Sequence, residues 1–235
     1  MQLFYNPDIS QTDTRVTFPK DESRHIVKVL RKKVGDKIHI TNGKGFLFVT
    51  ELNSADIKNC EANIIVADFK DPPLYNLHLA VAPTKMNDRF EWFLEKATEI
   101  GVTEITPIIC DNSERKTIKQ ERFERILQSA LKQSLRYYLP KLHPAMTFRE
   151  FLGRNLESQK LIAHCEETDK TSLKSQIQPR GSTVILIGPE GDFSPQEIEQ
   201  AKKINYTPVS LGDHRLRTET AAIVACHTVV LANQS

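Results

Sequence analysis

The spacing of hydrophobic residues changes once along the chain, close to residue 71. Before that point, short segments in which apolar and polar residues alternate surround a single stretch with helical spacing, residues 21–32. The segments at 37–41 and 46–52 flank the sequence NGKG, which is typical of a hairpin turn. Many short strands with one helix predict a small β-barrel over residues 1–70.

Two prolines in Asp71-Pro72-Pro73 mark the change, because proline interrupts both strand pairing and helices. We expect a linker over residues 71–76. Strands and helices then alternate, which predicts an α/β domain over residues 77–235 with a mostly parallel sheet covered on both faces. Ligands of such sheets bind beyond the carboxyl ends of the strands. The expected strands are 77–82, 105–110, 161–165, 183–187 and 209–211, and the expected helices are 88–100, 120–138 and 148–152, the last capped by Thr147.

The last segment, residues 220–232, is predicted to be a helix that is apolar on nearly every face. A helix without a polar face has to be covered on all sides, whereas a terminal helix on an ordinary sheet leaves one side in water. The pattern therefore indicates burial by a second subunit, by threading through another part of the chain, or by both.

A glycine-rich loop follows the apolar strand at 183–187. In the sequence GPEGDFSPQE, Ser194, Pro195 and Glu197 form a helix start with a capping box. Gly188 and Gly191 permit unusual backbone angles and close approach of a ligand. The loop matches neither G-x-G-x-x-G nor a P-loop, which argues against a nucleotide-binding oxidoreductase.

A second loop, LGDHRLRTETAA at residues 211–222, concentrates charges between two apolar runs. We expect Thr218 to cap the final helix and Glu219 to suit the positive end of its dipole. The simpler interpretation of this second loop is a capped surface loop with solvated charges.

A third loop follows strand 161–165, and we expect all three loops to converge. In it, His164 of the sequence HCEE (164–167) either lines the site or is a buried residue at a strand end.

Composition and charge limit the kinds of partner and site that we expect. The net charge is only +2, but residues 15–37 carry a local charge of +5 and residues 115–141 one of +6. Solvated helix faces explain either of the two charged blocks by itself, whereas two such blocks in a near-neutral chain favour a polyanionic partner.

The four cysteines are far apart in the sequence, as in a reduced cytoplasmic protein. The seven histidines have no metal-ligand spacing, so we expect no metal. No apolar run is long enough to span a membrane.

The two long motifs, GPEGDFSPQEIEQA and LGDHRLRTETAA, resemble the signature of the ribosomal RNA small subunit methyltransferase E family. That family belongs to the knotted SPOUT superfamily of RNA methyltransferases. Shorter similarities lie at RHIVKVLR (24–31) and FEWFLEKATEIGVTEITP (90–107), so the resemblance covers the whole chain. One departure is visible: KQSLR at 132–136 stands where the family usually has an E-Q-S-G-R type segment.

The resemblance implies an N-terminal PUA-like barrel that grips RNA, a C-terminal trefoil knot and a homodimer. It also implies transfer of a methyl group from S-adenosylmethionine to N3 of a uridine in 16S ribosomal RNA. The candidate RNA-binding residues are Arg24, Lys28, Arg31, Lys32 and Arg136, whereas His25 is better explained as a helix-face residue without catalytic duty.

The candidate cofactor-binding residues lie in the three loops and beside them. They are His164, Leu186, Ile187, Gly188, Pro189, Glu190, Gly191, Leu211, Gly212, Arg215, Leu216, Thr220 and Ala221.

Three residues are candidates for catalysis. We hypothesise that Arg217 orients the uracil, and that Glu219 or Glu190, ranked equally, accepts the N3 proton. Alternatively, Arg217 and Glu219 pair with each other and only shape the loop. Because neither motif contains a cysteine, we expect no covalent catalysis. A non-catalytic ribosome-assembly factor with a vestigial pocket is the alternative function.

Overall fold

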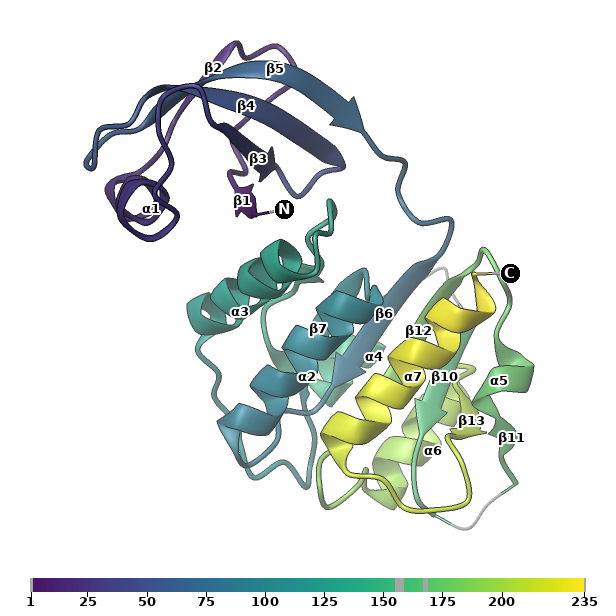
Figure 1. Ribbon diagram of the computed structural model, residues 1–235. Coiled ribbons are helices and arrows are strands. Elements are labelled where there is room, and N and C mark those ends of the chain that lie inside the picture. Colours follow the sequence, from purple (N-terminus) through teal and green to yellow (C-terminus); the bar gives the residue numbers. More distant parts are fainter. Residues whose placement is uncertain (1, 155–158, 167–168, 235) are drawn as a thin grey trace. The chain divides into compact units, whose positions relative to one another are not determined.

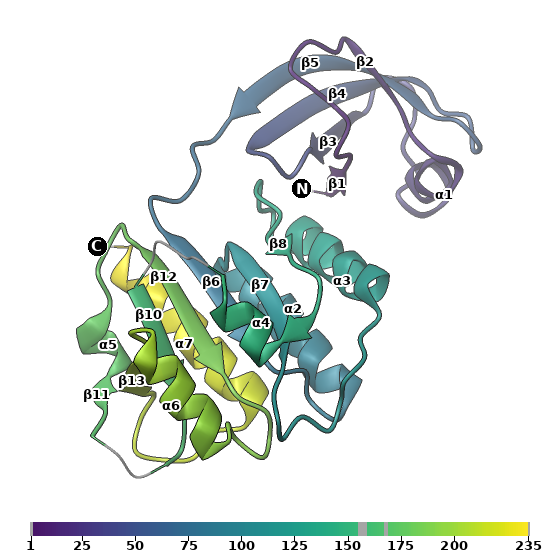
Figure 2. The ribbon, with the colours of Figure 1, turned by 180° about the vertical axis from the view of Figure 1, so that it is seen from behind.

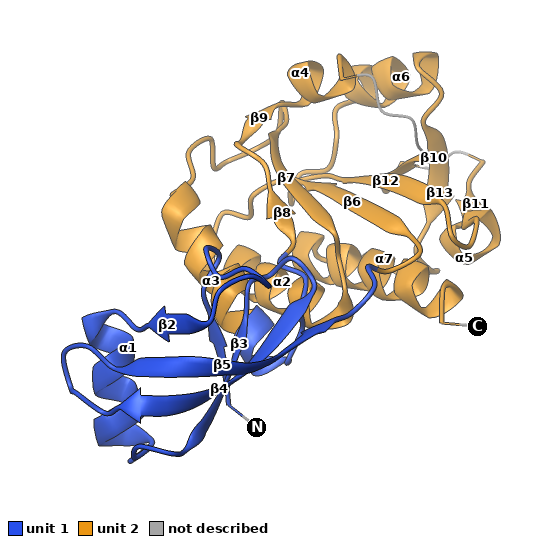
Figure 3. Cartoon of the chain, turned by 90° about the horizontal axis from the view of Figure 1, so that it is seen from above, with its two compact units in different colours: residues 1–72, 131–139 blue, residues 73–130, 140–235 orange. Residues whose placement is uncertain are grey.

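The computed structural model describes residues 2–154, 159–166 and 169–234. The chain forms two compact units (Figure 3). Unit 1 contains residues 1–72 and 131–139, and unit 2 contains residues 73–130 and 140–235. The return of residues 131–139 to unit 1 differs from the expected division, which assigned residues 77–235 to one domain.

Unit 1 is built on a five-stranded sheet in the order β1-β3-β4-β5-β2, in which only the β1–β3 pair is parallel. The predicted hairpin over NGKG is confirmed, since β3 and β4 pair antiparallel. Among the described residues β1 and β2 do not pair with each other, so backbone pairing does not close the predicted barrel. The strands are β1 (Leu3–Tyr5), β2 (Arg15–Thr17), β3 (Lys37–Thr41), β4 (Phe46–Ser54) and β5 (Glu61–Phe69).

The predicted helix at 21–32 is shorter than expected. It comprises α1 (Lys20–Arg24) and a π-helical turn, η1 (His25–Val29). Arg31 then adopts a left-handed conformation with φ 55°, and the N–H of Lys32 donates to the carbonyl of Ile26. This C-terminal hydrogen bond ends the helix before Arg31 and Lys32, which the pattern had placed inside it.

Helix α3 (Gln120–Gln133) also ends earlier than the predicted 120–138. Leu135 is left-handed with φ 57°, and the N–H of Arg136 donates to the carbonyl of Leu131. The chain then pairs with the β3–β4 turn, where the N–H of Gly45 donates to the carbonyl of Tyr137. The left-handed residue therefore sits at the position where the family usually has glycine.

We expect Leu135→Gly to stabilise the protein by about 1 kcal/mol, because a left-handed conformation costs a residue with a Cβ about that much. Urea unfolding followed by circular dichroism would measure the gain. Leu135→Ala is the matched control, since it shortens the side chain but keeps the Cβ. An equal gain from alanine would contradict the explanation.

Unit 2 contains a sheet in the order β11-β13-β10-β12-β6-β7-β8, with β9 pairing β7, and every pairing is parallel as predicted. The inner strands are buried because they are continuous runs of apolar residues. The strands are β6 (Asn76–Val81), β7 (Glu104–Ile109), β8 (Lys141–Leu142), β9 (Met146–Thr147), β10 (Gln159–Ala163), β11 (Thr171–Ser172), β12 (Ser182–Ile187) and β13 (Thr207–Ser210).

Helices cover both faces of this sheet. α2 (Asn87–Ile100) and α7 (Thr218–Ala232) lie on one face (Figure 1), and α4 (Phe148–Leu152) and α6 (Pro195–Lys203) on the other (Figure 2). The predicted capping boxes of Thr147 and Ser194 are both present. Short α5 (Leu173–Gln176) follows β11. Among the described residues, no helix has the length and apolar character needed to cross a membrane.

The N-terminus of α7 differs from the expectation. The N-cap is Arg217, which makes no side-chain capping bond, and Thr218 is the first helical residue. The Thr218 hydroxyl instead donates to the carbonyl of Gly188 at 3.0 Å, so it links two loops. Glu219 lies in the first helical turn, as predicted. Leu231 remains exposed, so α7 is not covered on every side within this chain.

Candidate functional site

The loops that follow β10, β12 and β13 meet at the carboxyl ends of these strands, as the sequence predicted. They enclose a cavity of about 200 Å³ between residues 163–165 and 209–216, and an adjoining one of about 280 Å³ beside residues 187–190. The two cavities share five lining residues and form one cleft: Ala163, Cys165, Arg215, Leu216 and Ala221.

Hydrogen bonds hold the three loops together. Arg215 donates from its guanidinium to the carbonyl of Glu190 at 3.3 Å, and the Thr218 hydroxyl donates to the carbonyl of Gly188. The backbone N–H of Cys165 donates to the Asp192 carboxylate at 2.7 Å. Each of the three loops is therefore tied to another by a polar contact.

Two glycines of the cleft lie where a residue with a Cβ would be crowded or strained. A Cβ on Gly188 would lie 3.1 Å from the ring of Phe193, closer than an ordinary contact. Gly212 has φ 141°, which residues with a Cβ rarely adopt, and a Cβ at this position would have no other atom within 4 Å among the described residues. The first glycine serves packing, and the second leaves open space at the cleft wall.

His164 lies on the wall of the cleft and is almost completely buried. Neither of its ring nitrogens has a hydrogen-bond partner among the described residues. Burial lowers the pKa of His164, and the nearby Lys170 lowers it further, so the ring is neutral near pH 7. A buried imidazole without a partner is costly unless a ligand supplies one.

We expect the stability of the protein to fall as the pH drops below 6.5, the ordinary pKa of histidine. Below that pH His164 is protonated in the unfolded chain but stays neutral in the folded protein, so protonation favours unfolding. His164→Phe, which keeps a ring without titrating, should weaken this dependence. Urea unfolding at about pH 7.5 and pH 5.5 would measure it. An unchanged slope in the variant would assign the effect to other groups.

The three catalytic candidates lie near one another but not as the sequence suggested. Glu219 is buried and forms an ion pair with Arg89 at 3.9 Å, while its second carboxylate oxygen, Oε2, has no partner among the described residues. Arg217 is exposed, and no ion pair joins it to Glu219 in the described part of the chain. The alternative in which these two residues pair with each other is therefore wrong.

Glu190 is held differently from Glu219. Its Oε1 accepts the backbone N–H of Lys85 at 2.9 Å, and it lines the inner cleft together with Arg217. Glu219 and Arg217 instead line an outer pocket of about 760 Å³ with Arg89, Trp92 and Thr220. Arg217 lines both hollows and so connects the cleft with the outer pocket.

Most of the predicted cofactor-binding residues line the cleft or the outer pocket. Leu186 does not, because its side chain is packed in the core between the sheet and the helices α4 and α6, and neither does Gly191, which packs against Asn112. The residues that line one of the hollows are His164, Ile187, Gly188, Pro189, Glu190, Leu211, Gly212, Arg215, Leu216, Thr220 and Ala221.

Sequence reasoning missed several participants. Asp192 lies within the glycine-rich motif, has φ 64° and anchors the loop after β10. Lys170 lines the cleft and donates to the carbonyl of His164. Arg89, the ion-pair partner of Glu219, lies on α2, far away in the sequence. Only Asp192 carried a local signal, since Asp in a Gly-rich turn tolerates a left-handed backbone. Glu167, the end of the third loop, lies outside the described residues.

The RNA-binding candidates all lie in unit 1. Arg24, Lys28 and Arg31 are exposed, and none forms an ion pair among the residues that the structure describes. Lys32 and Arg136 are partly buried. Three exposed cations within eight residues of chain give this unit a local basic surface.

Comparisons with known proteins identify the class and the family. Residues 70–230 match the RNA methyltransferase domain, and residues 18–65 match the RNA methyltransferase PUA domain. These matches place the chain among the RNA methyltransferases that carry a PUA domain. The ribosomal RNA small subunit methyltransferase E of Buchnera aphidicola subsp. Acyrthosiphon pisum is 32% identical over 219 residues, covering 88% of this chain and 85% of the relative. The chain belongs to the ribosomal RNA small subunit methyltransferase E family.

Two crystal structures are similar over nearly the whole chain. A probable rRNA-methyltransferase from Porphyromonas gingivalis is 40% identical, with a TM-score of 0.90 and coverage of 98% of this chain and 99% of that one. A ribosomal RNA small subunit methyltransferase E from Neisseria gonorrhoeae bound to S-adenosyl methionine is 31% identical, with a TM-score of 0.84 and coverage of 96% and 95%.

Proposed function

We propose that this protein transfers a methyl group from S-adenosylmethionine to N3 of a uridine in 16S ribosomal RNA. The observation that carries the proposal is the cleft formed by the three loops, with a buried, unpartnered histidine on its wall and Arg217 at its outer rim. Membership of the family and the S-adenosyl methionine bound to the Neisseria relative support the choice of cofactor.

The residues of the cleft fit S-adenosylmethionine. His164 offers a polar ring nitrogen to a ligand, and the backbone at Gly212 is open to close approach. Apolar contacts for an adenine or methionine group come from Ile187, Leu216 and Ala221. When bound, the cofactor supplies a methyl group on a positively charged sulfur.

The chain itself has to prepare the uridine. The neutral N3 carries a proton and has no free lone pair for attack, so a base has to remove that proton. We rank Glu219 ahead of Glu190, because Glu219 Oε2 has no partner among the described residues while Glu190 Oε1 already accepts a backbone N–H. Arg217 offsets the negative charge that develops on the uracil oxygens.

Methyl transfer to isolated 16S ribosomal RNA and to small subunits, using S-adenosylmethionine with an isotopically labelled methyl group, tests the proposal. Mass spectrometry of the nuclease-digested RNA would locate the label, and we expect 3-methyluridine. Label on another atom or base would refute only the assignment to N3, not methyl transfer itself.

Calorimetry with S-adenosylmethionine distinguishes the enzyme from the alternative function. Absence of cofactor binding would favour a non-catalytic assembly factor.

We further propose that Arg24, Lys28 and Arg31 contact the RNA backbone. Replacing all three with alanine should weaken RNA binding and reduce its log–log salt slope by about 2–3, since each lost phosphate contact lowers it by roughly 0.7–0.9. Fluorescence anisotropy at several salt concentrations would measure both. A control variant with Lys58, Lys174 and Lys203 replaced should keep the slope, and equal losses in both variants would indicate only a general charge effect.

We also propose that the protein is a homodimer and that its chain forms a trefoil knot, as the resemblance to the family implies. A homodimer would cover the exposed apolar side chains of Trp92 on α2 and Leu231 on α7, and sedimentation should then give close to double the monomer mass of 26.8 kDa. A SPOUT-type trefoil knot is supported by residues 211–218, which lie against the loops after β10 and β12. The ribosomal substrate and four free cysteines favour the cytoplasm.

A further inference from the structure

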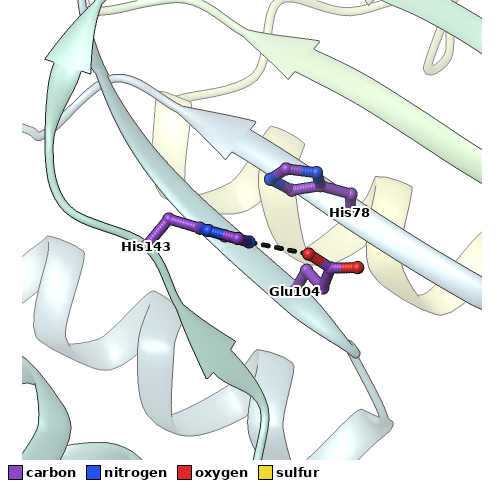
Figure 4. A group of neighbouring side chains, drawn as sticks. All are labelled: His78, Glu104 and His143. Atoms are coloured by element: carbon purple, nitrogen blue, oxygen red, sulfur yellow. Dashed lines mark hydrogen bonds and ion pairs between the residues drawn. The ribbon is translucent and has the colours of Figure 1, made fainter. Parts of the chain in front are cut away.

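Two histidines and a glutamate meet inside unit 2, away from the cleft. His78 lies near the start of β6, Glu104 is the first residue of β7, and His143 directly follows β8. These are the amino-terminal ends of β6 and β7, whereas the cleft lies at the carboxyl ends of the sheet. The three side chains point toward one another (Figure 4). The proposed methyl transfer uses none of them.

The potential donor atoms are close together. His143 Nε2 and Glu104 Oε2 are 2.7 Å apart, and the imidazole rings of His78 and His143 stack with centroids 5.1 Å apart. One ligand atom from each of the three residues lies within 4.8 Å of the other two. A tetrahedral zinc ion holds its ligand atoms about 3.4 Å apart, so shifts of about 1 Å would bring the set into bonding range.

Neighbouring polar groups orient the three side chains. Asn76 donates to Glu104 Oε1 at 3.0 Å, which leaves Oε2 directed at His143. Thr106 Oγ1 lies 2.7 Å from Nε2 of His78. Metal sites typically have such outer hydrogen bonds, because they fix the orientation of the ligands.

We propose that His78, Glu104 and His143 bind a divalent transition-metal ion, with Zn²⁺ as the best match. Two imidazoles and one carboxylate are a donor set that zinc prefers, and they leave a fourth position for water. Both histidines are buried, while the Glu104 side chain is 26% exposed and gives the ion a path from solvent.

Such an ion would join three segments that are distant in sequence. His143 lies four residues beyond the end of the 131–139 segment, where the chain has re-entered unit 2. β8 is only two residues long and pairs with β7 at two positions. A metal bond from His143 to β6 and β7 would therefore fix a segment that the short ladder holds weakly.

Titration of chelator-treated full-length protein with zinc chloride, followed by calorimetry, tests the site. We expect one ion per chain with a Kd of about 1 µM or tighter, and a higher Tm with zinc than without. Cobalt(II) should give the visible absorption of a four-coordinate ion, whereas magnesium, which prefers six oxygen ligands, should not bind.

Variants separate a metal site from a hydrogen-bonded core cluster. Glu104→Gln keeps the size of the side chain and should lower zinc affinity at least about tenfold, and His143→Ala should abolish binding. His39→Ala, in unit 1, should bind zinc as the unmodified protein does. Circular dichroism would confirm that each variant folds. If His143→Ala does not fold, the zinc affinity of Glu104→Gln decides the question.

Equal zinc affinity in the unmodified protein and in Glu104→Gln, or no one-to-one binding at all, would overturn the proposal. These readouts do not depend on methyl transfer. Failure of the metal site therefore leaves the proposed RNA methylation untouched, and failure of the methylation assay leaves the metal site untouched.

Discussion

Replacing Arg217 with alanine is expected to abolish detectable methyl transfer while changing cofactor affinity by no more than about threefold. Arg217 is exposed at the junction of the cleft and the outer pocket, and it has no capping role that the fold would lose. Removing one group that stabilises developing charge typically lowers the turnover rate by about 10²–10³-fold. Labelled methyl transfer would measure the rate, and calorimetry with S-adenosylmethionine would measure the affinity.

The control for this experiment is Arg149→Ala, which removes an exposed arginine from α4 on the other face of the sheet. It should retain full activity. Normal turnover in Arg217→Ala would exclude this residue from the reaction. A large loss of cofactor affinity would instead make it a binding residue for the cofactor.

Replacing Phe193 with alanine is expected to lower the free energy of unfolding by about 3–5 kcal/mol, the usual cost of removing a buried phenylalanine. The ring is buried between the sheet and its helices, with its centroid 5.4 Å from that of Phe148. It also packs against Gly188, where a Cβ would lie only 3.1 Å from the ring. The glycine-rich loop should therefore loosen, and cofactor affinity should fall together with stability.

Thermal unfolding with and without S-adenosylmethionine would record both effects. Phe193→Leu is the matched variant, because a volume-conserving apolar replacement usually costs less than about 1.5 kcal/mol. If alanine lowered stability but left cofactor affinity unchanged, the proposed support of the loop by Phe193 would be refuted.

Features that depend on neighbouring residues could be predicted from the sequence. The apolar run at 183–187 is a buried strand, and Ser194 with Glu197 forms the capping box that its spacing indicated. The alternation of strands and helices predicted a parallel sheet, and parallel strands bring their following loops to one edge. That single rule was sufficient to place the three loops together.

Features that depend on distant residues could not be predicted in this way. Glu219 pairs with Arg89 rather than with Arg217, which is closer in sequence, because α2 packs beside α7. Likewise, Glu104 lies 26 positions after His78 and His143 lies 39 positions after Glu104, far beyond any ligand spacing that a local motif shows. The early end of α3 depends on the left-handed conformation of Leu135. Leucine rarely adopts this conformation, so the sequence gives no sign of it.

Segment 131–139 has a practical consequence for dissecting the protein. Because it belongs to unit 1 although it lies in the middle of unit 2, the backbone crosses between the units three times. Cleavage in the proline-containing stretch near residue 72 would leave the halves tethered at two other points. A gene fragment encoding residues 73–235 would likewise separate residues 131–139 from the rest of the unit to which they belong. Separating RNA recognition from the cleft by truncation therefore requires grafting these nine residues as well as cutting the linker.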